Sequence, residues 1–350
     1  MTQARMKIAL IGHGAWGRHH ARALKAAPSA ELVAIVARGH ESATEAAADN
    51  PGVRVLREKG AVLADPTIEA VVVAVPNALH ARVALAALEA GKHVLLEKPM
   101  ALTLPDCDAL IAAAARAGRV LTIGHELRVS RQWAPIRAMI AAGTIGRLRH
   151  AAVSLFRFPY RDGSGGWRYD AATVGSWILE EPVHFFDLLL WYGRELGPPV
   201  SVRATPEGDP AMPLALAVTL RFADGAFATL NTVIGGFEHH LALHAMGEGG
   251  AIRALWSADM DRSGEPRASL HVFEGRAKPG QVARAIPFEK SGEIFELETQ
   301  AELAIQGFRA GRALVPAEEA RAAIACCLLA ERSAREGGRE IPWSEAEALP

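Results

Sequence analysis

A glycine-rich turn near the start of the 350-residue chain restricts its fold more than any other feature. Gly12, Gly14 and Gly17 lie between an apolar strand predicted over residues 6–11 and an amphipathic helix predicted over 15–27. In this setting the first glycine permits a tight turn, the second lets the backbone approach a pyrophosphate, and the third lets helix and strand pack closely. The helix N-terminus then faces the phosphates. The turn therefore predicts a dinucleotide site, with a ligand-free glycine-rich turn as the alternative.

Strands and helices alternate along the first part of the chain. Runs of Val, Ile and Leu with this alternation are typical of a parallel sheet covered on both faces. We therefore expect a Rossmann-type, doubly wound domain over residues 1–124. Further strands are predicted over 31–37, 53–56, 70–75, 93–96 and 120–123, and further helices over 42–49, 79–90 and 106–117.

The pattern changes after Gly124. Strand-like segments with alternating polarity dominate residues 200–288, and turns such as Asp224-Gly225 separate them. This alternation predicts an α+β domain over residues 125–350 with a large, mostly antiparallel sheet that is open on one face. The expected strands cover 150–157, 215–222, 226–233, 241–246 and 270–273, and the expected helices cover 133–142, 295–310 and 316–335.

The composition excludes several classes of protein. Apolar residues make up 50% of the chain, charged residues 22%, and the net charge is -1, so a broad nucleic-acid surface is not expected. Cys107, Cys326 and Cys327 lie in Ala/Leu-rich helical stretches, which favours buried thiols over disulfides. We see no apolar run of transmembrane length and no signal peptide. A cytoplasmic location without membrane partners is therefore expected.

The end of the second predicted strand indicates which dinucleotide the turn would bind. A site that prefers NAD usually has Asp or Glu about 20 residues past the glycines, where it binds the ribose 2′-hydroxyl. Here that position is Ala37, followed by Arg38. No carboxylate repels a 2′-phosphate there, and a guanidinium can pair with one. We therefore expect NADP(H) in preference to NAD(H), with Ala15 and Trp16 as further contacts; a stacked or solvated Arg38 is the alternative.

A lysine lies at the end of the strand predicted over 93–96, on the same sheet edge as the glycine turn. It belongs to Glu97-Lys98-Pro99. Taken alone, such a lysine is usually solvated, but beside a nicotinamide it can hold a substrate hydroxyl and help to move its proton. Pro76 and Asn77 end the preceding strand, where ligands bind in such sheets. Asn77 could equally cap the next helix, and His80 in that helix could be a surface residue.

A second cluster of polar residues lies at the start of a later predicted helix. Pro182 fits the first helical turn. His184 and Asp187 then share a face, with Glu180 or Glu181 at the entrance. An imidazolium is disfavoured near a helix N-terminus, so we expect a neutral histidine that can accept a proton. The alternatives are a metal site, for which no third strong ligand is apparent, and a buried core histidine.

Taken together, these motifs resemble the Gfo/Idh/MocA oxidoreductases, named for glucose-fructose oxidoreductase, inositol dehydrogenase and a rhizopine catabolism protein. The resemblance covers nearly the whole chain. The glycine turn alone is weakly specific, but in order with Glu-Lys-Pro and the His-x-x-Asp block it is highly specific. The matching residues are the glycine turn, Pro76-Asn77 with His80, Glu97-Lys98-Pro99, Arg128, Trp167-Arg168, and the segments 175–187 and 308–337.

The resemblance implies a catalytic set of a lysine, an aspartate and a histidine, in which the aspartate lies four residues before the histidine. These positions hold Lys98, Glu180 and His184, so a glutamate replaces the aspartate. The sequence also departs from the family in having Pro182 at a glycine position and Trp177, which is expected to line or crowd the pocket. The cofactor contacts expected are Gly12, Gly14, Ala15, Trp16, Gly17, Arg38, Pro76, Asn77, His80, Glu97 and Lys98. The substrate contacts expected are His125, Arg128, Trp167, Arg168 and Asp187.

The leading hypothesis is an NAD(P)-dependent dehydrogenase or reductase that acts on a sugar, polyol or related small molecule. In it, His184 exchanges the hydroxyl proton, Lys98 orients the same oxygen, and Glu180 orients His184. One alternative is an enzyme that retains its cofactor for glycoside cleavage or internal oxidoreduction. Another is a sensor or regulator that binds nucleotide without turnover. The resemblance also implies a homodimer or homotetramer formed through the open sheet.

Overall fold

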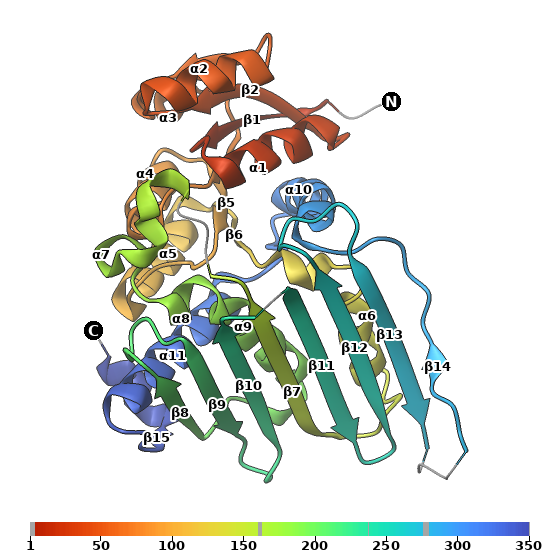
Figure 1. Ribbon diagram of the computed structural model, residues 1–350. Helices are drawn as coiled ribbons and strands as arrows, with labels where there is room; N and C mark the ends of the chain where they lie inside the picture. The colour runs from red at the N-terminus through yellow and green to blue at the C-terminus, as the bar shows by residue number, and fades with distance from the viewer. Residues whose placement is uncertain (1–3, 160–162, 237, 276–279, 350) are drawn as a thin grey trace.

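The computed structural model describes residues 4–159, 163–236, 238–275 and 280–349. Within these ranges the chain forms two β-sheets, a smaller one at the top of Figure 1 and a larger one below it. The first is parallel and the second mostly antiparallel, so the predicted fold class is confirmed.

The first sheet contains six parallel strands in the order β3-β2-β1-β4-β5-β6. All four residues of β4 are buried, as expected for a sheet covered on both faces. The strand order reverses beside β1, so the glycine turn that follows β1 lies at the switch point where such folds bind ligands. The strands are β1 (Met6–Ile11), β2 (Ala30–Val36), β3 (Arg54–Leu56), β4 (Ala70–Val73), β5 (His93–Glu97) and β6 (Leu121–Gly124).

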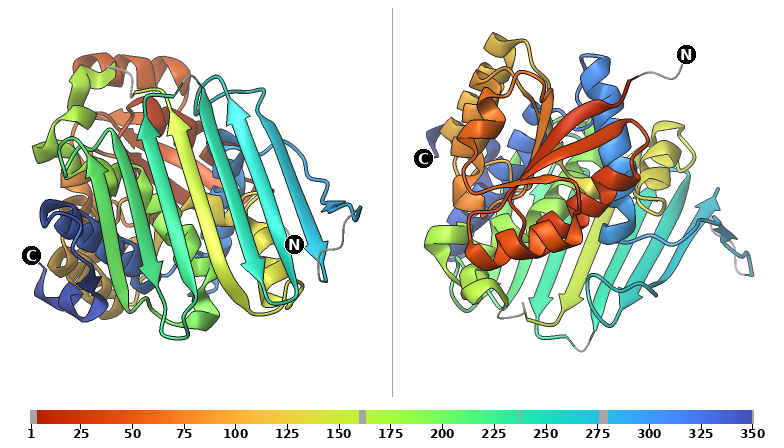
Figure 2. Two further views of the ribbon diagram at one scale, coloured as in Figure 1. Left: turned by 60° about the horizontal axis from the view of Figure 1, so that its bottom comes forward. Right: turned by 90° about the horizontal axis from the view of Figure 1, so that it is seen from above.

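Helices flank this sheet (Figures 1 and 2). In α5, Thr103 caps the N-terminus by accepting from the Asp106 backbone N–H, and Gly118 ends the helix in the left-handed conformation. Helix α10 comes from the far end of the chain, yet its Leu297 and Ile305 join the core formed by α1 and β2. These helices are α1 (Ala15–Ala26), α2 (His40–Asp49), α3 (Gly60–Ala64), α4 (His80–Glu89), α5 (Leu104–Ala117) and α10 (Glu293–Arg309).

The second sheet contains nine strands in the order β14-β13-β12-β11-β7-β10-β9-β8-β15. Only β7 and β10 run parallel to each other among the pairs of this sheet in the described residues. The strands are β7 (Leu148–Arg157), β8 (Ser201–Glu207), β9 (Ala215–Arg221), β10 (Phe227–Ile234), β11 (His239–Gly247), β12 (Gly250–Ala258), β13 (Arg267–Glu274), β14 (Arg284–Ala285) and β15 (Ile341–Pro342).

Burial alternates along this second sheet. On β10, Ala228, Leu230 and Thr232 are buried, whereas Phe227 is 42% exposed. In the left view of Figure 2 the helices lie behind the sheet, and the face of the sheet that carries no helices is turned toward the viewer. These helices are α6 (Ala134–Ala141), α7 (Ala171–Val174), α8 (Trp177–Glu180), α9 (Pro182–Tyr192) and α11 (Ala317–Arg335).

The structure agrees with most predicted elements to within a few residues, and the differences are informative. Strand β12 and the short helices α3, α7 and α8 carry no clear sequence signal of their own. Cys107, Cys326 and Cys327 are buried free thiols, which confirms their prediction as core residues. Trp177 is also buried in the core. None of the helices described here is both long and apolar enough to span a membrane.

Candidate active site

The glycine turn after β1 forms an open cradle at the N-terminus of α1. Gly12 has φ +106, and a Cβ there would lie 2.1 Å from the Ala74 carbonyl oxygen. A Cβ on Gly17 would lie 2.3 Å from the Gly12 carbonyl oxygen, so both positions require glycine. A Cβ on Gly14 would meet no atom within 4 Å, and this residue caps α1 without a side-chain hydrogen bond. The cradle therefore fits a pyrophosphate beside backbone N–H groups.

Because of this fit, Gly14→Val is expected to weaken dinucleotide binding without disturbing the fold. Because Gly14 has φ -81 and ψ -166, a β-branched residue can adopt its backbone conformation without strain. The new side chain fills the open space, so dinucleotide affinity should fall about 10-fold or more, which corresponds to about 1.4 kcal/mol. Nucleotide titration by fluorescence checks this, and Gly60→Val, another uncrowded glycine near a helix start, is the control. Unchanged affinity in Gly14→Val would exclude this cradle as the phosphate site.

Two arginines lie at the ends of neighbouring strands β2 and β3. Arg38 is exposed after β2, as the sequence predicts for a residue that meets a ribose phosphate. Arg57, which follows β3, donates from Nε to the Arg38 carbonyl oxygen at 2.8 Å. No sequence motif indicates Arg57, because the adjacency of β2 and β3 is a property of the folded sheet.

Two predicted cofactor contacts, His80 and Glu97, instead hold the sheet edge together. Both ring nitrogens of buried His80 face backbone carbonyls, those of Pro99 at 2.6 Å and Val75 at 2.8 Å. Glu97 is buried against His20 Nε2 at 2.6 Å. These side chains have their polar atoms engaged within the protein, which favours a bracing role over the cofactor contact expected from the sequence.

Asn77 connects this edge to the second half of the chain. Its amide nitrogen donates to Glu180 Oε2 at 2.9 Å and to the Val174 carbonyl at 3.1 Å. It begins a short 3-10 helix, Asn77–Leu79, without capping it by its side chain. Neither of the two roles considered for Asn77, cofactor contact or helix cap, describes these contacts. Pro76 precedes Asn77 in the segment that follows β4.

Lys98 lies between the two halves of the molecule. Its ammonium donates to the Glu180 carbonyl oxygen at 2.7 Å and lies 3.9 Å from Glu180 Oε1. Burial by itself lowers the pKa of Lys98, but the nearby carboxylates, led by those of Glu180 and Glu181, outweigh burial and raise it. The ammonium therefore stays charged at neutral pH.

Glu180 serves Lys98 rather than His184. Its Oε1 accepts from Arg168 Nε at 2.8 Å, and its Oε2 accepts from Asn77. Although burial raises the pKa of Glu180, Lys98 and Arg168 outweigh burial and lower it, so the group is a carboxylate. Among the described residues no hydrogen bond or ion pair joins Glu180 to His184, which favours a role beside Lys98 over the orienting role expected from the sequence.

His184, in the first turn of α9, is buried beside a different carboxyl group. Its Nδ1 lies 3.6 Å from Glu126 Oε1. Burial, followed by the charge of Lys98, places the pKa of His184 well below its usual value. The ring is therefore neutral, as the sequence predicted, but burial is the main cause. Glu126 follows β6 in a short 3-10 helix, Glu126–Val129, and no motif had singled it out.

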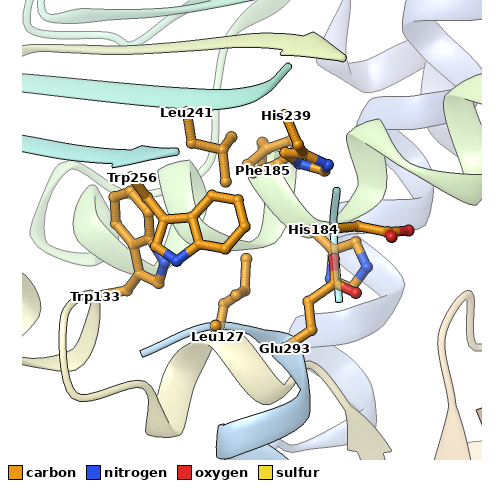
Figure 3. A pocket seen from close by; sticks show the side chains of 10 residues that line it. Leu127, Trp133, His184, Phe185, His239, Leu241, Trp256 and Glu293 are labelled. Atoms are coloured by element: carbon orange, nitrogen blue, oxygen red, sulfur yellow. The ribbon is translucent and has the colours of Figure 1, made fainter. Parts of the chain in front are cut away.

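A pocket opens beside His184. Figure 3 shows the indoles of Trp133 and Trp256 at one end of the pocket, with His184 and Glu293 at the other. Burial, followed by the charges of Asp261 and Glu181, raises the pKa of Glu293 to about 8. These lining residues come from separate elements, so only the folded chain brings them together. The remaining lining residues are Leu127, Phe185, His239, Leu241, Asp261 and Gly292.

Arg128 and Asp187, both expected at the substrate, form a buried pair with each other. Arg128 Nε and Nη2 donate to the two carboxylate oxygens of Asp187 at 2.7 and 2.6 Å, and Nη1 donates to Glu319. His125 is also buried, with Nε2 3.8 Å from Asp187. Because Asp187 is only 1% exposed and both oxygens are bound, it is placed to anchor Arg128 rather than to hold a substrate hydroxyl.

The remaining predicted substrate residues lie on the Glu180 side of the site. The guanidinium of Arg168 stacks over the Trp167 ring at 4.6 Å while it contacts Glu180. Glu181, the neighbour of Glu180, pairs with buried Arg157 at 2.8 Å. The sequence did not indicate the Arg157 partner, which arrives from β7.

Comparison with known proteins identifies the family. Residues 6–125 match the family described as "Oxidoreductase family, NAD-binding Rossmann fold", and residues 133–253 match "GFO/IDH/MocA C-terminal domain". The chain belongs to the Gfo/Idh/MocA family. The resemblance stated from the motifs is therefore confirmed at the level of the family.

Individual relatives of this Gfo/Idh/MocA protein show how far the similarity extends. The 1,5-anhydro-D-fructose reductase of Ensifer adhaerens is 34% identical over 183 residues, 51% of this chain and 54% of that protein. The scyllo-inositol 2-dehydrogenase (NADP(+)) of Bacillus subtilis is 29% identical over 193 residues, 52% of each chain. The matched part thus spans about half the length of these relatives. The crystal structure of aldose-aldose oxidoreductase from Caulobacter crescentus has the same fold, with a TM-score of 0.80, 20% identity and coverage of 97% and 99%.

Proposed function

We propose that this protein is an NAD(P)-dependent oxidoreductase that transfers a hydride between the nicotinamide and a hydroxyl or carbonyl carbon of a sugar or polyol. The main supporting observation is that charged Lys98 lies close enough to neutral His184 to lower its pKa, and that Lys98 follows β5 at the same edge of the first sheet as the glycine turn. The pocket beside His184 combines indole faces with polar groups, which suits a carbohydrate ring. The names of the relatives, an anhydrofructose reductase and an inositol dehydrogenase, support this substrate class.

The residues of the chain supply binding and proton transfer. When bound, the nicotinamide exchanges a hydride with the carbinol carbon of the substrate. Lys98 orients the substrate oxygen and stabilises the negative charge that develops on it. His184 takes up or releases the hydroxyl proton. Asn77 and Arg168 each donate to one carboxylate oxygen of Glu180 and so fix its position. Glu180 in turn accepts a hydrogen bond from Lys98 at its backbone carbonyl and places a negative charge near the ammonium.

The preferred dinucleotide is proposed to be NADP(H). Arg38 lies where the ribose 2′-position of a bound dinucleotide is expected, and Arg57 brings a second guanidinium to the same edge. Two arginines can pair with a 2′-phosphate, and no carboxylate at Ala37 competes for the ribose. The NADP(+) in the name of the Bacillus subtilis relative is consistent with this preference.

Arg38→Asp is expected to reverse the cofactor preference. The carboxylate repels a 2′-phosphate and can accept from the ribose 2′-hydroxyl, so NADPH should bind about 10- to 100-fold more weakly, while NADH binding is retained or improved. Parallel fluorescence titrations with the two nucleotides measure the ratio. Arg22→Asp, which alters an arginine on α1 away from the ends of β2 and β3, is the charge-matched control. Tighter binding of NADH than NADPH by the unaltered protein would refute the NADP proposal.

Activity is tested by a screen with the preferred nucleotide. The purified protein is offered sugars, polyols and their keto forms, and nucleotide absorbance is followed. Substrate-dependent oxidation or reduction of the nucleotide is expected. Turnover without added nucleotide would instead indicate a retained cofactor, and binding without any turnover would indicate a sensor.

We also propose that the open face of the second sheet joins copies of this chain into a homodimer or homotetramer. Phe156, Phe227 and Met246 are 42%, 42% and 52% exposed on the neighbouring strands β7, β10 and β11. His150 of β7 is in register with both Phe227 and Met246, and its ring contacts that of Phe227. Sedimentation of the unaltered protein and of Phe227→Glu tests this assembly, and a monomeric unaltered protein would refute it.

A further inference from the structure

Glu126 is a buried acid that the proposed reaction has not yet used. It is 1% exposed, and neither carboxyl oxygen has a hydrogen-bond partner among the described residues. Leaving such a group unpaired in the interior costs about 1–3 kcal/mol, so its position calls for a physical reason. Helix α10 packs directly over the 3-10 helix that carries it, which keeps water away from the carboxyl group.

The polar group facing Glu126 is the imidazole of His184. Nδ1 of this ring is also buried without a hydrogen bond, and it lies 3.6 Å from Glu126 Oε1. This separation is slightly longer than a hydrogen bond, and contacts of this kind often tighten when substrate binds. His184 also lines the pocket, so its ring connects Glu126 with the substrate space.

The charges around the pair favour a proton on the carboxyl group. Burial, followed by the charges of Glu293 and Glu97, raises the pKa of Glu126 well above its usual range, although Lys98 opposes this. Burial and Lys98 lower the pKa of His184. A proton shared by the two groups therefore rests on the glutamate. The titratable or charged groups that act on the pair are Lys98, Glu97, His125, Glu181, Arg157 and Glu293.

We propose that Glu126 is the terminal proton carrier of the reaction and exchanges its proton with the substrate through His184. This inference rests on the function proposed above. In the oxidative direction the substrate C–H and O–H bonds break and a C=O bond forms. The hydride passes to the nicotinamide, the hydroxyl proton passes to His184 Nε2, and the Nδ1 proton passes to Glu126 Oε1. The ring ends neutral, with its proton on Nε2, and the carboxyl group ends protonated. Reduction runs through the same transfers in reverse.

This arrangement sets the direction of the pH dependence. Oxidation needs the carboxylate form of Glu126, so its rate rises with pH through the pKa of the pair. Reduction needs the protonated form and declines over the same range. The part of the pH profile over which the rate changes is called the pH limb. Because the two groups titrate together, the pKa that this limb reports is a property of the pair and not of one residue. The limb lies well above the usual pH range of a carboxyl group, since the pKa of Glu126 is raised.

Glu126→Gln tests the relay, because the amide keeps the size of the side chain but cannot take up the proton. We expect kcat of the holoenzyme to fall about 10- to 100-fold in both directions, with loss of the pH limb and little change in nucleotide affinity. Glu296→Gln is the matched control. Glu296 is another fully buried glutamate whose pKa burial raises, and it accepts from Ser291 Oγ at 2.7 Å. Its substitution should leave kcat and the pH profile unchanged.

Two results would overturn the relay. One is an unchanged kcat and pH profile in Glu126→Gln. The other is a lower kcat with the limb intact, which would indicate only a structural role.

A second readout does not depend on turnover. In ¹⁵N-histidine spectra at pH 7, with His184→Asn used for assignment, we expect the unaltered protein to hold His184 mainly as the Nε2–H tautomer. Glu126→Gln should shift this tautomer balance, and identical tautomer populations would refute the pair. If no substrate is turned over by the unaltered protein, the proposed function fails, and these spectra still decide whether the pair exists.

Discussion

Lys98→Met is expected to lower kcat about 10²- to 10³-fold with little change in nucleotide affinity. The substitution removes a charged donor at the proposed substrate oxygen, and the loss of one such donor typically has an effect of this size. Methionine keeps the length and packing of the side chain, so the Glu180 carbonyl loses its 2.7 Å hydrogen bond but no large cavity forms. Steady-state kinetics with the substrate found in the screen, together with nucleotide titration, measure the two effects.

Lys92→Met is the matched control. Lys92 is 4% exposed and, like Lys98, donates to backbone carbonyls, those of Asp65 at 2.6 Å and Ile68 at 2.8 Å. It lies at the opposite end of β5 from Lys98 and does not line the pocket, so its loss should reduce stability by about 1–3 kcal/mol while kcat per folded molecule is retained. An unaltered kcat in Lys98→Met, or an equal loss in both variants, would remove Lys98 from the mechanism.

Arg128→Leu is expected to lower the free energy of unfolding by about 3–5 kcal/mol, the largest stability effect predicted for this chain. Asp187 would keep its place, 1% exposed, but lose both bonds from the guanidinium. The free energy of unfolding falls because the Asp187 carboxylate is left buried without its positively charged partner. Chemical denaturation followed by tryptophan fluorescence measures it.

Arg137→Leu provides the comparison, because Arg137 also forms a two-pronged contact with a carboxylate, that of Glu195. The Glu195 side chain is 57% exposed, so this pair should contribute no more than about 1 kcal/mol. Arg128→Leu combined with Asp187→Leu should recover part of the lost stability, since no charge then stays unpaired. Equal costs for the two arginine substitutions would contradict the role assigned to the buried pair.

Local sequence patterns predicted the first sheet well, because each strand–helix unit has its own periodicity and end signals. The glycine turn and the apolar runs of β1, β4 and β5 are features of this kind. Strand β12 was missed because the apolar run Ala254-Leu255-Trp256 interrupts the alternation of apolar and polar residues, and its identity depends on pairing with the neighbours β11 and β13. The return of α10 to the first sheet is a long-range contact that no local pattern encodes.

The candidate site was predicted in part for the same reason. Lys98 and His184 belong to compact motifs, so they were found before the fold was known. Glu126, Arg157 and Glu293 were not, because each gains its meaning only from a partner on a distant element. Conversely, His80 and Asp187 belong to motifs but are engaged inside the protein. Motif membership therefore located the site but did not distinguish residues that contact ligands from those that support them.

Hydride transfer at this site is tested most directly by isotope tracing. The protein is incubated with a keto substrate from the screen and with NADPH that carries deuterium at C4, using each of the two C4 epimers in turn. The proposed function predicts that deuterium from one epimer appears on the new carbinol carbon of the product, and that Lys98→Met forms such product far more slowly. Product that carries no deuterium from either epimer would contradict it.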